Sequence, residues 1–249
     1  MGLVEDIIQG ETVFPRRFAH VEERDYGLLY YTPEIPNSSD GNHARILRLG
    51  DAVAVIADVQ DFYRRRNLTP RVRVYDLSLR GDIDRLRSAL LAAGFQFADH
   101  ANQFYVHHQP SRITPNAELT VRRVQSPLPK LLAMVEASDS ERAMKVVRRS
   151  LACPDYHLLV GFLSGQPVTM AAVERAGSVT RVDDVLTHKP CRGKGYSRTL
   201  IHELLQYHSQ VLGGVLCLYT DNPTAARIYE EAGFEKLDVP LDHWSAWQD

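Results

Sequence analysis

A basic turn with two glycines joins a predicted strand to a predicted helix within residues 182–198. Backbone N–H groups in such a turn, and in the first turn of the next helix, have no internal partners and point outward with the positive end of the helix dipole. Gly193 and Gly195 leave room for a ligand to approach the backbone closely. Positive charge is added by Arg192, Lys194 and Arg198. The pattern predicts an anion site suited to a pyrophosphate.

Two common phosphate-binding motifs do not fit this turn. A Walker loop needs G-x-x-x-x-G-K-[ST], whereas the two glycines here are separated by a single residue. A dinucleotide fingerprint needs G-x-G-x-x-G, and position 198 is arginine. The pattern that remains is R-x-x-G-x-S, which runs from Arg192 to Ser197.

A second motif follows after one more predicted strand. Asn222 is well suited to cap a helix, and Pro223 is well suited to begin it. The helix carries Tyr229 and is expected to stop at Gly233, which precedes Phe234.

Together the two motifs resemble the signatures of the GCN5-related N-acetyltransferases, the GNAT superfamily. The first signature is [QR]-x-x-G-x-[GA], from which the chain departs at Ser197, and the second is N-x-x-A-x-x-x-Y followed by G-F. Both occur in the family's order and spacing, so the resemblance covers about residues 117–249. It implies an α/β (α+β) GNAT fold, in which helices flank a central mixed, mostly antiparallel sheet.

The predicted elements around the motifs follow the order β-α-α-β-β-β-α-β-α-β, which the family uses. Ser164-Gly165-Gln166 predicts a hairpin, and two short helices are expected within residues 127–152. The helix after the glycine turn is amphipathic. The other expected strands span residues 118–125, 156–163, 167–174, 178–187 and 215–219.

The first half of the chain shows a weaker version of the same succession. A helix, a strand, a helix, a Gly-Phe pair and a strand are predicted at residues 51–66, 71–77, 82–93, 94–95 and 103–107. This repeat predicts two GNAT-like domains, residues 1–110 and 117–249, joined by a linker at 109–116. Because the first half lacks the glycine turn, we expect it to shape the acceptor pocket or pack as a partner. An unrelated α/β domain is the alternative.

Composition indicates a globular protein that binds neither membranes nor nucleic acid. No run is long and apolar enough to span a bilayer, and the N-terminal residues lack a signal-peptide pattern, so a cytoplasmic location is expected. The net charge of −2 argues against general nucleic-acid binding. Three cysteines without CxxC spacing suggest reduced thiols, and no Cys/His cluster predicts a metal site. Both a monomer and a homodimer are compatible with these features.

The resemblance implies acetyl-CoA as cosubstrate and assigns its contacts. The pantetheine arm would lie along the strand before the turn like an added strand, and Asn222 would contact the arm or only cap its helix. Tyr229 would protonate the departing sulfur, the alternative being a tyrosine that only fills the core. The remaining residues assigned to the cofactor are Val185, Leu186, Thr187, Arg192, Gly193, Lys194, Gly195, Tyr196 and Ser197.

The general base is sought among acids on the strand before the turn. Asp183 and Asp184 are adjacent and would face opposite sides of a regular strand, with Asp183 on the face of Val185. A bulge in that strand would change this parity. We favour Asp183, with Asp184, Glu174 and His188 as alternatives.

The expected function is acetyl transfer from acetyl-CoA to a primary amine, directly within a ternary complex. A covalent route through Cys191 is less favoured, because this residue lies beside the phosphate turn. A non-catalytic coenzyme A-binding regulatory module and a transferase that uses another acyl-CoA are the alternatives. The sequence does not identify the acceptor amine.

Overall fold

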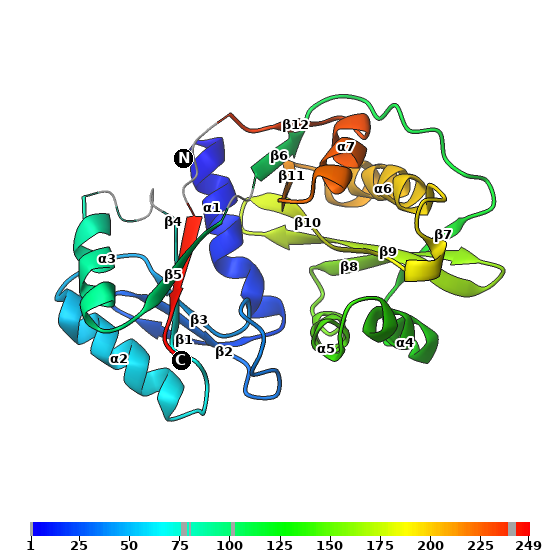
Figure 1. The fold of residues 1–249 in the computed structure, drawn as a ribbon. Coiled ribbons are helices and arrows are strands. Elements are labelled where there is room, and N and C mark those ends of the chain that lie inside the picture. Colours follow the sequence, from blue (N-terminus) through cyan, green and yellow to red (C-terminus); the bar gives the residue numbers. More distant parts are fainter. Residues whose placement is uncertain (1, 76–78, 80, 101–102, 239–242) are drawn as a thin grey trace. The chain divides into compact units, whose positions relative to one another are not determined.

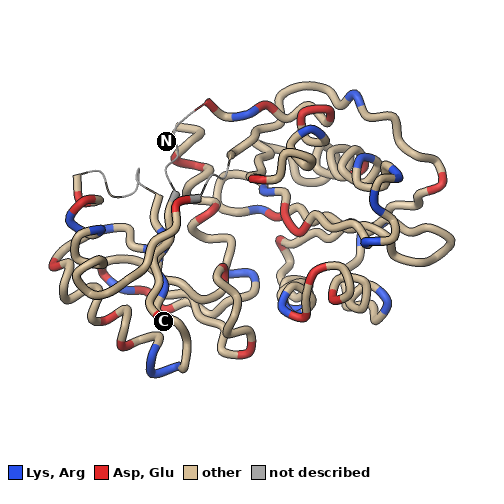
Figure 2. The backbone as a smooth tube through the Cα atoms, in the orientation of Figure 1, with Lys and Arg blue, Asp and Glu red and all other residues tan. Residues whose placement is uncertain are grey.

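The computed structural model describes residues 2–75, 79, 81–100, 103–238 and 243–249 (Figure 1). The chain divides into two compact units, each built from separate stretches of sequence. Unit 1 combines Met1–Arg17 with Gln103–Asp238, and unit 2 combines Phe18–Asn102 with Val239–Asp249. Basic and acidic positions are interspersed along both units (Figure 2). The compact units therefore differ from the expected domains 1–110 and 117–249. Residues 1–17 belong to unit 1 with most of the second half, and residues 239–249 belong to unit 2 with most of the first half.

A mixed sheet forms the centre of unit 1. Among the described residues its strand order is β12-β6-β11-β10-β9-β8-β7, and all neighbours are antiparallel except the parallel pair β10 and β11. The strands are β6 (Gln103–His107), β7 (Thr120–Val124), β8 (Tyr156–Leu163), β9 (Gln166–Ala176), β10 (Val179–Thr187), β11 (Leu216–Thr220) and β12 (Phe234–Lys236). The helices and helical turns are α1 (Leu3–Val13), η1 (Phe14–Arg17), α4 (Pro129–Ser138), α5 (Glu141–Ser150), η3 (Lys189–Cys191), α6 (Tyr196–Tyr207), η4 (His208–Leu212) and α7 (Pro223–Glu231). From β7 to β12 the order expected from the resemblance is confirmed.

Side chains of β9 alternate between the two faces of this sheet, and both faces are buried. Ala171 and Val173 point to one face, where they join a core that includes Leu200 and Leu204 of α6. Met170 and Ala172 point to the other face, where they join a core with α4 and α5. Because β9 is covered on both sides, it reads in the sequence as a nearly continuous apolar run.

Helix α1 packs against the β9–β10 hairpin of unit 1, although the sequence analysis predicted no element at residues 1–50. Ile7 and Ile8 are buried and, with Leu3, follow helical spacing, which is the pattern in the sequence that indicates this helix. A Cβ at Gly10 would lie 2.8 Å from Val179 Cγ2 and 3.1 Å from the Ala176 carbonyl oxygen. Glycine in a helix interior costs about 1 kcal/mol relative to alanine, and here it allows the helix to lie directly on the strands.

Unit 2 has its own mixed sheet, with the strand order β1-β2-β3-β4-β13-β5 among the described residues. Its strands are β1 (His20–Arg24), β2 (Gly27–Tyr31), β3 (His43–Ile46), β4 (Arg71–Tyr75), β5 (Gln96–His100) and β13 (His243–Trp247). Helices α2 (Ala52–Arg64) and α3 (Ile83–Ala92) pack on this sheet through a core that includes Val59, Leu86 and Trp244. Both helices were predicted, as was β4, whose expected last residues, 76 and 77, lie outside the described residues.

The strand at residues 103–107 was assigned to the wrong half of the chain. It is β6 and pairs with β11 and β12 in the sheet of unit 1. Conversely, β13, from the end of the second half, pairs with β4 and β5 in unit 2. Local patterns predict that a segment is a strand, but the strand with which it pairs depends on nonlocal packing. The sequence therefore does not show that β6 joins the sheet of unit 1 and β13 the sheet of unit 2.

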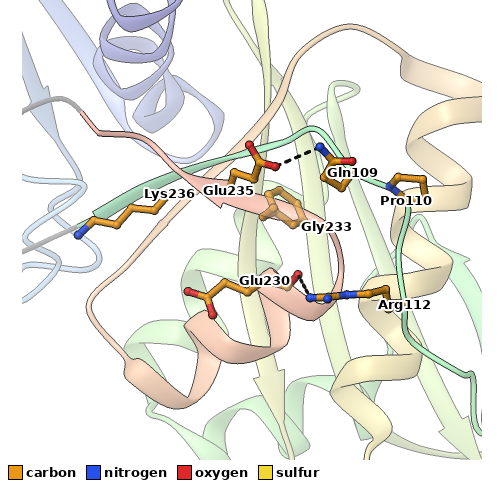
Figure 3. A pocket seen from close by; sticks show the side chains of 8 residues that line it. Gln109, Pro110, Arg112, Glu230, Gly233, Glu235 and Lys236 are labelled. Carbon is orange, nitrogen blue, oxygen red and sulfur yellow. Dashed lines mark hydrogen bonds between the residues drawn. The ribbon is translucent and has the colours of Figure 1, made fainter.

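The expected linker, residues 109–116, lies along unit 1. The Arg112 backbone N–H donates to the Glu231 carbonyl at 3.0 Å, and the Asn116 N–H donates to Thr199 Oγ1 at 2.8 Å. Ile113 is buried in the core shared with α6. Figure 3 shows Arg112 reaching the Glu230 carbonyl and Gln109 reaching Glu235.

Gly233 is required where the chain crosses itself beside this segment (Figure 3). Its φ is +94°, and its carbonyl accepts from the N–H groups of His108 and Gln109 at 3.1 and 3.0 Å. A Cβ at this position would lie 1.9 Å from the Gln109 carbonyl oxygen. The Gly-Phe pair of the second motif therefore has a packing reason.

We expect Gly233→Ala to destabilise the protein by about 2–4 kcal/mol, the sum of the left-handed backbone penalty and the forced repacking. Urea unfolding of the full chain should show the loss. Gly94→Ala is the matched control, because Gly94 has φ +82° and its nearest recorded neighbour for a Cβ is Gln248 Nε2 at 3.5 Å. Equal losses in the two variants would contradict the close-contact argument.

Candidate active site

A cleft of about 480 Å³ in unit 1 brings the two sequence motifs together. Its walls are the end of β10, the glycine turn, the first turn of α6, and α7. The predicted site residues that line it are Val185, Leu186, Thr187, Arg192, Gly193, Gly195, Tyr196, Ser197, Asn222 and Tyr229. Lys194 is exposed and does not line it, and Asp183 is not part of its wall. A second cavity, of about 660 Å³ beside Gly233, contains neither the glycine turn nor Tyr229 (Figure 3).

The glycine turn has the backbone conformation that its sequence predicts. Gly193 and Gly195 both have φ +77°, in the left-handed region that other residues rarely adopt. No heavy atom lies within 4 Å of a Cβ built on either glycine, so both face open space. Gly195 is the N-cap of α6, which places the first N–H groups of that helix at the cleft. Arg192 Nε ties the turn to β10 by donating to the Thr187 carbonyl at 3.1 Å.

A β-bulge separates the end of β10 from the rest of the strand. Asp183 pairs with Ala172 and Leu186 with Met170, so two residues of β10 oppose one residue of β9. Within the bulge Asp184 has φ +50°. In the described structure, pairing between β10 and β11 covers Thr180 and Arg181, so the two strands part before the cleft.

Asn222 and Tyr229 enter the cleft from α7. Asn222 Oδ1 accepts from the N–H groups of Thr224 at 2.9 Å and Ala225 at 3.3 Å, so it caps the helix. Tyr229 is 6% exposed and its ring packs edge-on against Phe234. Burial, and to a lesser extent the Asp183 charge, raises the pKa of Tyr229, so its hydroxyl stays protonated at neutral pH. Core packing and access to the cleft are thus compatible for this residue.

Six ionisable side chains form what we call the bulge cluster, next to the bulge in β10. Arg17 Nη1 contacts Glu174 at 2.5 Å, and Arg17 Nη2 contacts Asp183 at 2.6 Å and Asp184 at 3.1 Å. A second guanidinium, Arg181, contacts Asp183, Glu174 and Glu11. The members are Glu11, Arg17, Glu174, Arg181, Asp183 and Asp184.

The carboxyl groups of this cluster differ in basicity. Burial alone would raise the pKa of Asp183, but Arg181 and Arg17 outweigh it and hold that pKa well below its usual value. Burial and the neighbouring Asp183 charge raise the pKa of Asp184, and burial raises the pKa of Glu174 to about 7. Asp183 is therefore a weak base, contrary to what its position in the sequence suggested. The predicted facing with Val185 fails because the bulge breaks the strand's alternation.

The other candidate groups lie elsewhere around β10. His188 is at the end of the strand, and its Nδ1 lies 2.8 Å from Ser138 Oγ of α4. It is not part of the cleft wall. Cys191 lines the cleft within η3, next to the glycine turn, as its position in the sequence predicted. Cys153 and Cys217 are also free thiols.

Sequence reasoning missed Glu11, Arg17 and Arg181. Arg17 and Glu174 are 157 positions apart, and no local pattern links them. The available signal was a charged residue beside the apolar positions of each of two neighbouring strands, Glu174 of β9 and Arg181 of β10, because buried charges need partners.

No helix in the described ranges has the length and apolar character needed to cross a bilayer. Within the same ranges, no group of three or more His, Cys, Asp or Glu side chains is arranged to hold a metal ion.

Comparison with known proteins connects this geometry to a family. Residues 133–243 match a family model described as an acetyltransferase (GNAT) domain. No curated protein sequence matches the chain.

Several solved structures share the fold at low sequence identity. A GCN5-related N-acetyltransferase from Kribbella flavida has a TM-score of 0.69 at 16% identity, with 100% of this chain and 96% of that chain covered. A tandem GNAT protein from the clavulanic acid biosynthesis pathway has a TM-score of 0.56 at 14% identity, with 82% and 74% covered. A GCN5-related N-acetyltransferase from Sphaerobacter thermophilus has a TM-score of 0.53 at 15% identity, with 92% and 75% covered.

The fold and the cleft place the chain in the class of GNAT-fold proteins, including those built from two such halves. More particularly, residues 133–243 match the model of a GNAT acetyltransferase domain. This match supports acyl transfer as the general function.

Proposed function

We propose that the protein transfers an acetyl group from acetyl-CoA to a primary amine by direct attack in a ternary complex. The observation that carries this proposal is the convergence of the glycine turn, the end of β10 and Tyr229 on one cleft. Each supplies a different requirement of the reaction, namely phosphate binding, positioning of the thioester and a proton for the leaving group.

The cleft offers suitable groups along the length of coenzyme A. The N–H groups of the turn and of the first turn of α6 would bind the pyrophosphate, with Arg192 adding charge. The backbone of Val185–Thr187, beyond the pairing of β10 with β11, would bind the pantetheine arm like an added strand. An N–H group of the same segment would polarise the thioester carbonyl. The Asn222 oxygen is used in capping, so any contact with the arm falls to its amide nitrogen.

The chemical step needs one proton removed and one supplied. The neutral amine attacks the thioester carbon, the C–S bond of the tetrahedral intermediate then breaks, and the Tyr229 hydroxyl protonates the departing thiolate. We infer that the amine proton goes, directly or through water, to the carboxyl pair of the bulge. Asp184 is the stronger base of that pair because its pKa is raised, whereas Asp183 stays ionised beside two arginines.

The test of this function starts with ligand binding. A ligand that binds only the folded state adds about 2.7 kcal/mol at a concentration of 100 Kd. For a chain of this size, coenzyme A should then raise Tm by roughly 5–10 °C. A screen of primary amines with acetyl-CoA, monitored by release of free thiol, should identify the acceptor. Adenosine monophosphate serves as the control for binding without the pantetheine arm.

Each outcome discriminates between the alternatives. No stabilisation by millimolar coenzyme A would overturn the proposal. Stabilisation without thiol release, across both amines and acyl-CoA donors, would identify a non-catalytic coenzyme A-binding module. Release with a longer acyl-CoA but not with acetyl-CoA would retain the mechanism and change the donor.

A further inference from the structure

We infer that Arg17 is a positioning residue of the acyl-transfer site and that the N-terminal segment, residues 3–17, is part of that site. This segment lies outside the residues 133–243 that match the family model. The inference rests on the proposed function, because Arg17 would act by holding the β10 bulge beside which the cofactor binds.

The geometry of two adjacent aspartates carries the argument. Neighbouring side chains of a regular strand point to opposite faces, so Asp183 and Asp184 should not reach the same group. Here both carboxylates contact Arg17 Nη2, at 2.6 and 3.1 Å. The bulge allows this convergence, and the guanidinium in turn holds the two carboxylates together.

The bulge needs such support because its backbone is unfavourable. Asp184 has φ +50°, a left-handed conformation that non-glycine residues rarely adopt. Its carboxylate accepts from the Tyr156 hydroxyl at 2.7 Å as well as from Arg17. The Arg17 guanidinium also lies over the Tyr156 ring, 5.0 Å from its centroid. Arg17 and Tyr156 therefore hold Asp184 from two sides.

Arg17 also links the bulge to the neighbouring strand. Its Nη1 contacts Glu174 of β9 at 2.5 Å, while its Nη2 contacts the aspartates of β10. The planar fork of arginine suits several carboxylates at once, whereas the ammonium group of lysine is a single point charge. Directly after the bulge come Val185, Leu186 and Thr187, the backbone proposed to bind the pantetheine arm. A shift of the bulge would displace these residues.

The N-terminal segment is built to deliver Arg17 to this place. Gly10 lets α1 lie directly on the β9–β10 hairpin. The next residue, Glu11, pairs with Arg181, and about one turn further on the centroid of the Phe14 ring lies 4.2 Å from the Arg181 guanidinium and 5.7 Å from that of Arg17. Arg17 itself is buried, with a side chain 4% exposed. These contacts fix the segment at both ends of η1.

The charges around the bulge come from several elements and set the expected pH behaviour. The ionisable groups that face it are Glu11 of α1, Arg17 of η1, Tyr156 of β8, Glu174 of β9, Arg181, Asp183 and Asp184 of β10, Tyr219 of β11 and Tyr229 of α7. Removing the Arg17 cation takes away an interaction that favours ionised Asp183 and Asp184. The acidic limb of the pH–rate profile should then move to higher pH.

Two variants of the full chain test the inference. Arg17→Lys keeps one positive charge but lacks the fork. The double variant Arg17→Met, Glu174→Gln removes one cation and one carboxylate together, so it limits the unpaired buried charge. Arg175→Met is the control, because Arg175 is an exposed arginine on the same strand as Glu174 and donates to the Leu212 carbonyl. The readouts are the circular dichroism spectrum, Kd for coenzyme A, and kcat/KM against pH.

We expect both Arg17 variants to lose affinity for coenzyme A and to lose about 10- to 100-fold in kcat/KM, because small displacements of reacting groups are costly. Only the double variant should shift the acidic limb upward. Arg175→Met should match the unmodified protein. If the double variant does not fold, Arg17→Lys decides.

Folded Arg17 variants with unchanged affinity and unchanged kcat/KM would overturn the inference. Loss in Arg175→Met equal to that in Arg17→Lys would also overturn it, since the loss would then not be specific to Arg17. The unmodified protein separates this result from the proposed function. If it neither binds coenzyme A nor turns over, the function fails, whereas if it does both and Arg17 is dispensable, only the positioning role fails.

Discussion

Gly195→Val should abolish most coenzyme A binding while the protein stays folded. Gly195 faces open space in the cleft, so a valine side chain would project to where the pyrophosphate is proposed to bind. A β-branched residue at φ +77° would also turn the first N–H groups of α6 away from the ligand. Loss of one or two hydrogen bonds to a charged group corresponds to about 10- to 100-fold in Kd. Isothermal titration calorimetry measures this directly.

The hairpin glycine Gly165 provides the matched control. Its φ is +75°, and a Cβ there meets no atom within 4 Å, so Gly165→Val imposes nearly the same backbone strain away from the cleft. It should retain the affinity of the unmodified protein. If both valine variants lose affinity, the cause is strain or unfolding. If both keep it, the turn does not bind the cofactor.

Tyr229→Phe should lower kcat by roughly 10²–10⁴-fold, the usual contribution of a general acid. The substitution keeps the ring that packs against Phe234 and deletes the hydroxyl. Because the raised pKa of Tyr229 keeps that hydroxyl protonated, the native residue can supply a proton at neutral pH. Affinity for acetyl-CoA should change little. The measurement is single-turnover thiol release, in which the chemical step is observed.

Tyr105→Phe is the control for this variant. Tyr105 lies in the same buried core as Tyr229 but does not line the cleft. Its phenylalanine variant should match the unmodified protein in kcat. If the single-turnover rate of Tyr229→Phe stays within about twofold of that of the unmodified protein, the Tyr229 hydroxyl is not the general acid and the role of Tyr229 is structural.

The parts of the fold that the sequence predicted are those encoded by local patterns. Helix caps such as Asn222, stops such as Gly233 and the hairpin at Gly165 specify where elements begin and end. The two motifs then placed those elements in order, and the order from β7 to β12 is confirmed. Residues that line the cleft could also be named from the sequence, because they lie within or beside the two motifs.

What the sequence did not predict depends on contacts between distant residues. The exchange of β6 and β13 is one case, because each strand has a pattern that suits either sheet. The bulge cluster is another, since Arg17 meets carboxylates more than 150 positions away. The prediction that Asp183 and Val185 share a face was wrong for a local reason. The bulge adds one residue to β10, so every side chain beyond it points to the opposite face from that expected for a regular strand. Catalytic roles of Tyr229 and the bulge acids remain predictions.

The exchange of strands also bears on how the protein is made. Synthesis proceeds from the N-terminus, and domains generally fold as their residues emerge from the ribosome. Unit 2 cannot finish its sheet in this way, because β13 lies between β4 and β5 yet follows every other described strand in the sequence. Until then the edges of β4 and β5 stay open to wrong partners. The sheet of unit 2 therefore stays incomplete while unit 1 is translated, and it can close only after residues 243–247 have been made.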